Sequence, residues 1–110
     1  MGKLDGQAAF ITGGARGIGF ATAVMMTREG ATVGVADLDG EGAVRAAKDL
    51  AQFGRPGVAF TVDVSKREMV DQAIDGFHAK AGRLDILVNN AGITRDGLLM
   101  RMTDEQWDLV

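Results

Sequence analysis

The 110-residue sequence contains no cysteine and a single histidine, His78. Disulfides and thiolate metal sites are therefore excluded, as is a site built from several histidines, so we predict no metal centre. No apolar run approaches the roughly 20 residues of a membrane-spanning helix. No apolar stretch follows Lys3 at the N-terminus, so we expect no signal peptide. The absence of cysteine fits a reducing compartment, and we expect a cytoplasmic protein.

Basic charge is also scarce. Twelve Lys and Arg residues stand against fifteen Asp and Glu residues, which gives a net charge of −3. Neither half of the chain has the basic excess that binding to a phosphate backbone requires. We therefore expect no nucleic-acid partner and no anionic membrane partner.

Glycine, by contrast, is abundant, with 16 residues in 110, or about twice the usual share of ~7%. Hydrophobic residues make up 46% of the chain, which is enough for a core, so disorder does not explain the glycines. We expect them at turns and where backbone segments approach each other closely.

Short apolar runs alternate with helical patterns along the chain. The expected strands span residues 7–12, 31–36, 58–62 and 84–88. The expected helices span residues 17–29, 40–53 and 65–82, and a further helix begins at Thr103. This order predicts an α/β fold over residues 1–110: a Rossmann-like doubly wound parallel sheet with strand order 3-2-1-4.

Each expected helix has a predicted buried face and a predicted stop. Glycines at positions 30, 54 and 82 supply the stops, and Ser65 with Glu68 matches a capping box at the start of the third helix. The predicted buried faces are Ile18, Ala21, Thr22, Met25 and Met26 for the first helix, Val44, Ala47, Leu50 and Ala51 for the second, and Val70, Ala73, Ile74 and Phe77 for the third.

The turn after the first strand, residues 12–19 (Thr-Gly-Gly-Ala-Arg-Gly-Ile-Gly), carries the clearest chemical signal. Gly13 permits a tight turn, Gly17 lets backbone approach a phosphate, and Gly19 allows close packing of helix on strand. The helix start directs unpaired N–H groups and partial positive charge to one place, which favours a pyrophosphate. Asp37 follows 18 residues after Gly19, as in dinucleotide-binding folds. The alternative is a turn that needs glycine for steric reasons alone.

Together with Asp63-Val64 and Asn89-Asn90-Ala91-Gly92, this turn resembles the short-chain dehydrogenase/reductase family over nearly the whole chain. Residues 90–102 are similar to the 3-oxoacyl-acyl-carrier-protein reductase branch, and acetoacetyl-CoA reductases and related alcohol dehydrogenases share such a segment. The resemblance implies an NAD(P)-dependent oxidoreductase that reduces a 3-oxoacyl thioester in fatty acid metabolism or interconverts an alcohol and a ketone. Its partners would be a nicotinamide dinucleotide, a small-molecule or acyl-thioester substrate, and further copies of itself.

The resemblance also implies a set of cofactor-binding residues. These are Gly13, Gly14, Ala15, Arg16, Gly17, Ile18, Gly19, Asp37, Leu38, Asp63, Val64, Asn90, Ala91 and Gly92. Asp37 would accept hydrogen bonds from the adenosine ribose and repel a 2′-phosphate, which favours NAD over NADP. Arg16 would favour NADP instead, because NADP-preferring relatives use an arginine there. We nevertheless predict NAD, because the carboxylate of Asp37 would repel a 2′-phosphate directly. A helix cap or turn aspartate is the alternative for Asp37.

Asp63 would accept a hydrogen bond from the adenine amino group, and Val64 would supply an apolar wall. A capping role beside Ser65 is the alternative for Asp63. Asn90 is the expected cofactor contact, whereas a structural role suits Asn89 equally well. The apolar residues 98–100 and Trp107 would suit a subunit interface, with core packing as the simpler alternative.

The chemistry of the family uses Ser, Tyr and Lys, and this sequence contains no tyrosine. Its one serine, Ser65, stands at the wrong place, so we assign no catalytic residue. Two hypotheses follow. The chain is either the N-terminal, cofactor-binding half of an NAD(P)-dependent reductase, or a stand-alone nucleotide-binding or interaction module without hydride transfer. We favour the first hypothesis, because the sequence ends seven residues into the last expected helix, where a helix would not naturally end.

Overall fold

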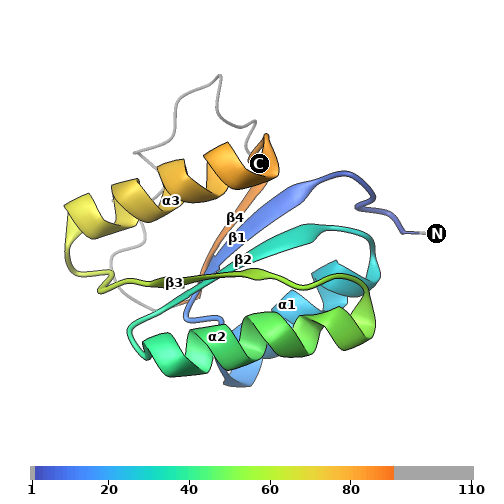
Figure 1. Cartoon of the computed structure of the whole chain (residues 1–110), viewed down its shortest axis with the longest axis horizontal. Coiled ribbons are helices and arrows are strands. Elements are labelled where there is room, and N and C mark those ends of the chain that lie inside the picture. The colour runs from blue at the N-terminus through green and yellow to red at the C-terminus, as the bar shows by residue number, and fades with distance from the viewer. Residues whose placement is uncertain (1, 91–110) are drawn as a thin grey trace.

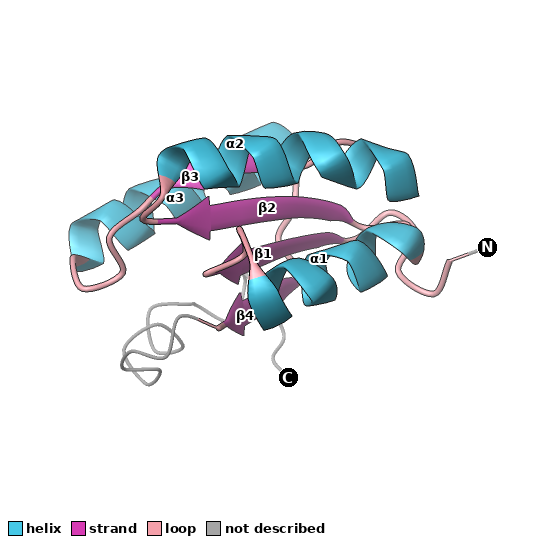
Figure 2. Ribbon diagram, turned by 90° about the horizontal axis from the view of Figure 1, so that it is seen from below, coloured by secondary structure: helices cyan, strands magenta, loops and turns pink. Residues whose placement is uncertain are grey.

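The computed structural model describes residues 2–90, which form a parallel four-stranded sheet covered by helices on both faces (Figure 1). The elements are β1 (Ala8–Thr12), α1 (Gly17–Arg28), β2 (Thr32–Asp37), α2 (Gly40–Asp49), the 3-10 helix η1 (Leu50–Phe53), β3 (Val58–Thr61), α3 (Arg67–Ala81) and β4 (Ile86–Asn89). The strand order β3-β2-β1-β4 confirms the predicted sheet. Figure 2 shows β2, β1 and β4 following one another across it.

β1 is the centre of this sheet, and all five of its residues are buried. Its last residue, Thr12, lies level with Ala36 of β2 and with Asn89 of β4. Because all the strands are parallel, the carboxyl ends of β1, β2 and β4 meet at one edge, where α/β sheets bind ligands. The glycine turn, Asp37 and Asn90 therefore lie at the same edge.

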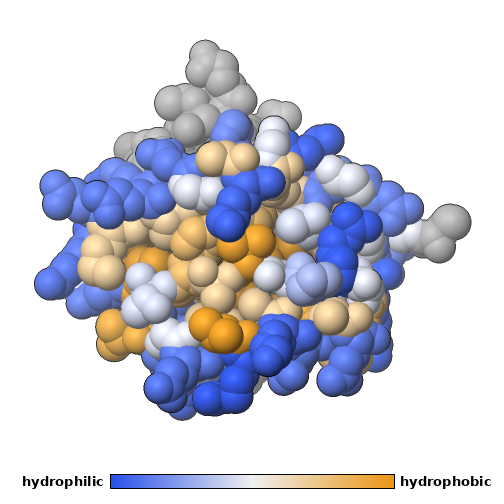
Figure 3. All heavy atoms as spheres, in the orientation of Figure 1, coloured by the Kyte–Doolittle hydropathy of each residue, from blue (hydrophilic) through white to orange (hydrophobic). Residues whose placement is uncertain are grey.

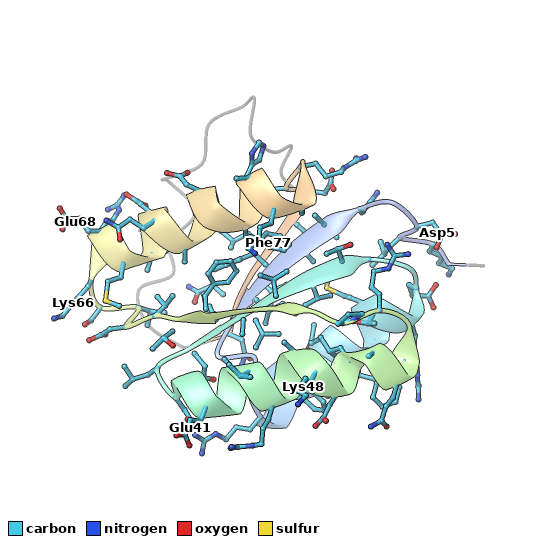
Figure 4. All side chains as sticks on the ribbon, in the orientation of Figure 1. Asp5, Glu41, Lys48, Lys66, Glu68 and Phe77 are labelled. Atoms are coloured by element: carbon cyan, nitrogen blue, oxygen red, sulfur yellow. The ribbon has the colours of Figure 1, made fainter. Side chains whose placement is uncertain are left out.

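α3 covers one face of the sheet, and α1 and α2 cover the other (Figure 1). On the α3 side, Phe77 points toward the sheet (Figure 4), and its ring lies 5.7 Å from that of Phe10 and 6.3 Å from that of Phe60. The opposite core contains Ile11, Val33, Val35 and Leu50 with small residues of α1 and α2. Figure 3 shows apolar residues gathered across the middle of the face along which β3 runs.

The predicted buried faces are correct for α3 and mostly wrong for α1. Val70, Ala73, Ile74 and Phe77 are all buried. In α1 the buried residues are instead Gly19, Ala23 and Thr27, while Ile18 and Met25 are 76% and 65% exposed. Glycine is needed at position 19 because a Cβ there would overlap the backbone of the glycine turn, while Phe20, Val24 and Met26 pack, partly buried, against the core. In α2 the prediction was half right, since Ala47 and Leu50 are buried but Val44 and Ala51 are exposed.

The helices differ from the predictions at one start and in the segment expected as a helix over residues 40–53, which is α2 followed by η1. Gly30 and Gly82 have positive φ angles of 100° and 84° and follow α1 and α3, as expected. After α1, Gly30 N–H donates to Thr27 and Ala31 N–H donates to Met26, the Schellman pattern. The capping box was wrong: Lys66 and not Ser65 directly precedes α3, no side chain caps this start, and the Ser65 hydroxyl donates to Asp63.

Between residues 2 and 90 no helix combines the length and the apolar character that crossing a membrane would demand. The expected helix from Thr103, the apolar residues 98–100 and Trp107 lie outside the described residues.

Candidate functional site

The glycine turn is fastened to the end of β2 by its backbone. The N–H groups of Gly13 and Gly14 lie 2.7 and 3.3 Å from the carbonyl oxygen of Ala36. Gly13 and Gly17 have φ angles of 67° and 61°, a region that favours glycine. The turn therefore has a defined path from β1 to α1 that these two glycines make possible.

The start of α1 has no side-chain cap in the part of the chain that the structure describes. Arg16 precedes the helix in an extended conformation, and no acid lies in its first turn. A Cβ placed on Gly17 would have no atom of residues 2–90 within 4 Å. The first N–H groups of a helix lack intrahelical acceptors, so this geometry leaves them available to an anion.

Gly19 lies against the backbone of the turn and against Asn90. A Cβ at Gly19 would overlap the carbonyl oxygen of Gly13 and come within 2.7 Å of the Asn90 side-chain nitrogen. Asn90 Nδ2 itself donates to that same carbonyl over 3.2 Å. The amide of Asn90 therefore holds the end of β4 to the turn, and Gly19 leaves room for it.

Thr12 joins the two asparagines to the centre of the sheet. Its buried hydroxyl accepts from the Asn90 N–H at 3.0 Å and lies 3.2 Å from Asn89 Oδ1, to which it can donate. These bonds satisfy polar groups that would be costly to bury unpaired. Thr12 is a residue that our sequence reasoning left out of the site, although it opens the motif.

Asp37 ends β2 and binds two backbone N–H groups. Its Oδ2 accepts from Ala15 in the glycine turn and its Oδ1 accepts from Asp39, each over 3.1 Å. The alternative role as a turn aspartate is therefore present in the structure. It is compatible with ligand binding, because each carboxylate oxygen can accept more than one hydrogen bond.

Arg16 and Asp39 form an ion pair at this edge of the sheet. Arg16 Nη2 lies 3.4 Å from Asp39 Oδ2, and the side chains are 75% and 40% exposed. Both residues line a cleft of about 330 Å³ between α1 and α2, together with Phe20, Arg45 and Asp49. We did not single out Asp39 from the sequence, although an Asp directly before a helix is a known start signal.

Asp63 and Val64 follow β3. Asp63 Oδ1 accepts from the Ser65 hydroxyl at 2.6 Å and from the Ser65 N–H at 3.0 Å. These hydrogen bonds, the hydroxyl's first, hold the pKa of the Asp63 carboxyl below its usual range. Val64 is half-buried and packs against the α3 side of the core.

Two exposed apolar side chains flank the turn. Ile18 is 76% exposed and Leu38 is 69% exposed, and both were predicted cofactor-binding residues. Both lie near the carboxyl edge of the parallel sheet, where α/β proteins bind ligands. The predicted residues Ala91 and Gly92 lie outside the described part of the chain.

The sequence matches the family described as short chain dehydrogenase over residues 7–110. The chain belongs to the short-chain dehydrogenase family. It is 46% identical to the 3-oxoacyl-[acyl-carrier-protein] reductase FabG of Chlamydia trachomatis over 99% of its own length and 44% of the relative's. The FabG proteins of Thermotoga maritima and Escherichia coli are 42% and 39% identical, over 44% and 42% of their lengths. The chain thus spans less than half of these relatives.

Solved structures of short-chain dehydrogenases share the fold. A short chain dehydrogenase from Mycobacterium paratuberculosis bound to NAD superposes with a TM-score of 0.78 and 36% identity, over 84% of this chain and 39% of that one. Carveol dehydrogenase from Mycobacterium avium in complex with NAD gives a TM-score of 0.77 and 31% identity, over 93% and 44%. These likenesses confirm the fold and the family predicted from the sequence.

Proposed function

We propose that this chain binds a nicotinamide dinucleotide as the cofactor-binding part of an oxidoreductase. The observation that carries the proposal is the uncapped start of α1, which faces open space at Gly17 on the carboxyl edge of a parallel sheet. Backbone N–H groups and the helix dipole at such a place suit a pyrophosphate. Two solved short-chain dehydrogenases of the same fold are described with bound NAD, which supports the same class of cofactor.

The proposal assigns the adenosine half of the dinucleotide to the residues around the turn. Asp37 would bind the ribose hydroxyls, while Leu38, Asp63 and Val64 would surround the adenine and Asn90 would lie on the nicotinamide side of the pyrophosphate. The carboxylate of Asp37 supports NAD rather than NADP, since it would repel a 2′-phosphate. When bound, the nicotinamide supplies hydride transfer. The chain's own contribution is to bind and orient it.

The proposed reaction is the reduction of a 3-oxoacyl thioester, or the interconversion of an alcohol and a ketone. Its support is the similarity to 3-oxoacyl-[acyl-carrier-protein] reductases, of which the chain spans less than half. We also propose that the protein forms homo-oligomers. The apolar residues 98–100 and Trp107 in the sequence support that part of the proposal.

Calorimetric titration with NAD⁺ tests the proposal through two glycine variants. Gly17→Ala and Gly82→Ala both place a side chain at a positive φ where no atom lies within 4 Å, so the backbone strain is alike. Gly82 ends α3, before β4 and away from the turn. We expect Gly17→Ala to weaken NAD⁺ binding about tenfold or more, because its methyl group would occupy the space in front of the helix. Gly82→Ala should leave affinity unchanged. Absence of binding by the unmutated protein, or equal losses in both variants, would contradict the proposal.

A further inference from the structure

β3 is an edge strand with little protection against pairing. It pairs with β2 on one side, and no described strand pairs with its other side. At four residues β3 is short, but Val58–Thr61 includes no charged residue and no proline, which are the usual means of blocking an open edge. Figure 3 shows apolar residues gathered on this side of the molecule. An open apolar edge of this kind is an interaction surface.

Two residues of β3 direct their backbone hydrogen-bonding groups to the open side. The Val62 N–H donates to the carbonyl oxygen of Asp37, the last residue of β2, over 3.0 Å. Because these groups alternate in direction along a strand, the N–H and C=O groups of Ala59 and Thr61 point away from β2. Ala59 lies at the centre of this open edge.

α2 runs alongside β3 in the opposite direction. Near the start of the helix, Glu41 and Val44 line a hollow together with Thr61, the last residue of β3. Near the end of the helix, the carbonyl oxygen of Ala47 accepts from the Gly57 N–H at 2.9 Å. Glu41 is therefore level with the end of β3, and the last turn of α2 is level with the residue before β3.

The exposed face of α2 has one charge of each sign. Glu41, Val44 and Lys48 are exposed, and their spacing of three and four residues places them on one face of the helix. Figure 4 shows Glu41 near the start of α2 and Lys48 further along it. If a second β3 paired antiparallel with the first, Thr61 of each copy would lie opposite Gly57 of the other. Glu41 of each copy would then lie opposite Lys48 of the other.

We propose that β3 and α2 form an interface between two copies of this chain, in which the β3 strands pair antiparallel about a two-fold axis at Ala59. A second copy is the occupant that these charges fit, because the two-fold axis brings each charge to its opposite. Backbone hydrogen bonds join the strands, and two ion pairs between Glu41 and Lys48 fix their direction. The inference adds a surface to the proposed homo-oligomer and uses none of the residues assigned to the dinucleotide.

Sedimentation equilibrium of the 110-residue chain measures the dissociation constant of this dimer, and an exchange of charges tests its geometry. Glu41→Lys and Lys48→Glu each place like charges opposite one another at two points of the dimer. We expect each single variant to weaken dimerisation about tenfold. The double variant Glu41→Lys/Lys48→Glu restores both pairs with their signs exchanged, so it should recover most of the affinity.

Two further variants separate this geometry from general effects. Glu68 is exposed in the first turn of α3, on the opposite face of the sheet (Figure 4), so Glu68→Lys makes the same charge change away from the interface and should dimerise normally. Ala59→Pro removes an N–H that points away from β2, and edge strands tolerate proline at such positions. This variant, with its fold checked by circular dichroism, should lose the dimer.

Several results would overturn the inference: an unmutated protein that stays monomeric, single charge variants that dimerise normally, a double variant as weak as the single ones, or an equal loss in Glu68→Lys. A dimer that persists in folded Ala59→Pro would overturn the pairing of the strands. None of these results bears on dinucleotide binding, which the NAD⁺ titrations test separately.

Discussion

At the scale of single residues, the polar groups of the site already hold the glycine turn and the strand ends together without a ligand. Thr12, Asp37 and Asn90 each bridge two chain segments, and each bond involves a backbone group of the turn or of a neighbouring strand. Such bonds preorganise the turn, which lowers the cost of ordering it when a ligand binds. Substitutions at these positions are therefore expected to affect stability and binding together.

Thr27 is the exception among the buried polar groups of the described residues. It is 2% exposed, and its hydroxyl has no hydrogen-bond partner there. We expect Thr27→Val to raise the free energy of unfolding by about 1 kcal/mol, because an unpaired hydroxyl is replaced by a methyl group of the same shape. Thr22→Val is the control in the same helix. The Thr22 hydroxyl donates to Ile18 at 2.8 Å, so this variant should not be stabilised. Urea unfolding of both variants measures the difference, and equal effects would contradict the explanation.

Asp85 gives a pH-dependent contribution to stability. Two hydrogen bonds of 2.8 Å from Arg83 hold the pKa of its carboxyl below the usual range, and the Ala8 N–H adds to the effect. Because the pKa is lower in the folded state, the stabilisation is present above the unfolded pKa of about 4 and disappears as the pH falls through the folded value. Arg83 is 55% exposed, so we expect Asp85→Asn to cost about 0.5–1 kcal/mol at pH 7. In urea titrations the difference between the variant and the unmutated protein should shrink as the pH falls below about 4. A difference that does not depend on pH would contradict this origin.

At the scale of elements, glycine has opposite effects in β2 and α3. A Cβ on Gly34 of β2 would lie 2.9 Å from the ring of Phe77 and 3.0 Å from that of Phe10, both of which are fully buried. A Cβ on Gly76 of α3 would meet only Phe60, at an ordinary 3.5 Å. We expect Gly34→Ala to destabilise by about 1–3 kcal/mol through overpacking, and Gly76→Ala to stabilise by about 0.5–1 kcal/mol through helix propensity.

Thermal or urea unfolding of the two variants checks these signs. Phe77→Leu combined with Gly34→Ala should cost less than the sum of the single changes, because the smaller side chain vacates the space that the methyl group needs. Strict additivity would indicate that Gly34 is required for a reason other than the two rings.

The sequence predicted the elements well because each apolar run was bounded by a glycine or an acid. It predicted the buried face of α3 because its apolar residues are separated by polar ones at helical spacing. α1 is apolar or small on every side, so periodicity alone could not show that Gly19 and Ala23 face the sheet while Ile18 and Met25 do not. The choice depends on how closely the turn approaches the helix, which is a tertiary contact.

For the site, the sequence predicted which segments come together but not which hydrogen bonds their side chains form. The turn and the strand ends come together because parallel strands share an edge, and the motifs placed them there. Which oxygen takes which partner was not predictable. The Ser65 hydroxyl donates to Asp63 and does not cap α3, and Arg16 pairs with Asp39. Short polar side chains in turns have several possible hydrogen-bond partners nearby, and their spacing in the sequence does not show which one they bind.

At the scale of the whole molecule, binding and catalysis should be separable in this chain. The family resemblance assigns the general acid to a tyrosine, and the 110 residues contain none. A general acid contributes ~10²–10⁴-fold, so we expect no measurable oxidation of NADH with an acetoacetyl thioester. The assay follows NADH absorbance with the 110-residue chain. Turnover comparable to that of a complete reductase would show that the reaction does not need this acid.

The last strand of the described sheet should govern association beyond the proposed dimer. β4 pairs with β1 on one side, and no described strand pairs with its other side. Its residues Ile86, Leu87 and Val88 are apolar and uncharged, and such an edge favours pairing between molecules. We therefore expect the 110-residue chain to associate beyond a dimer as its concentration rises, which light scattering measures directly. Ile86→Lys should reduce the association, because a charge on an edge strand opposes pairing. Thr61→Lys, on the opposite edge strand β3, is the matched comparison and should weaken the proposed dimer instead. A cooperative monomer or dimer at high concentration would mean that residues 1–110 cover this edge themselves, which would favour the stand-alone module.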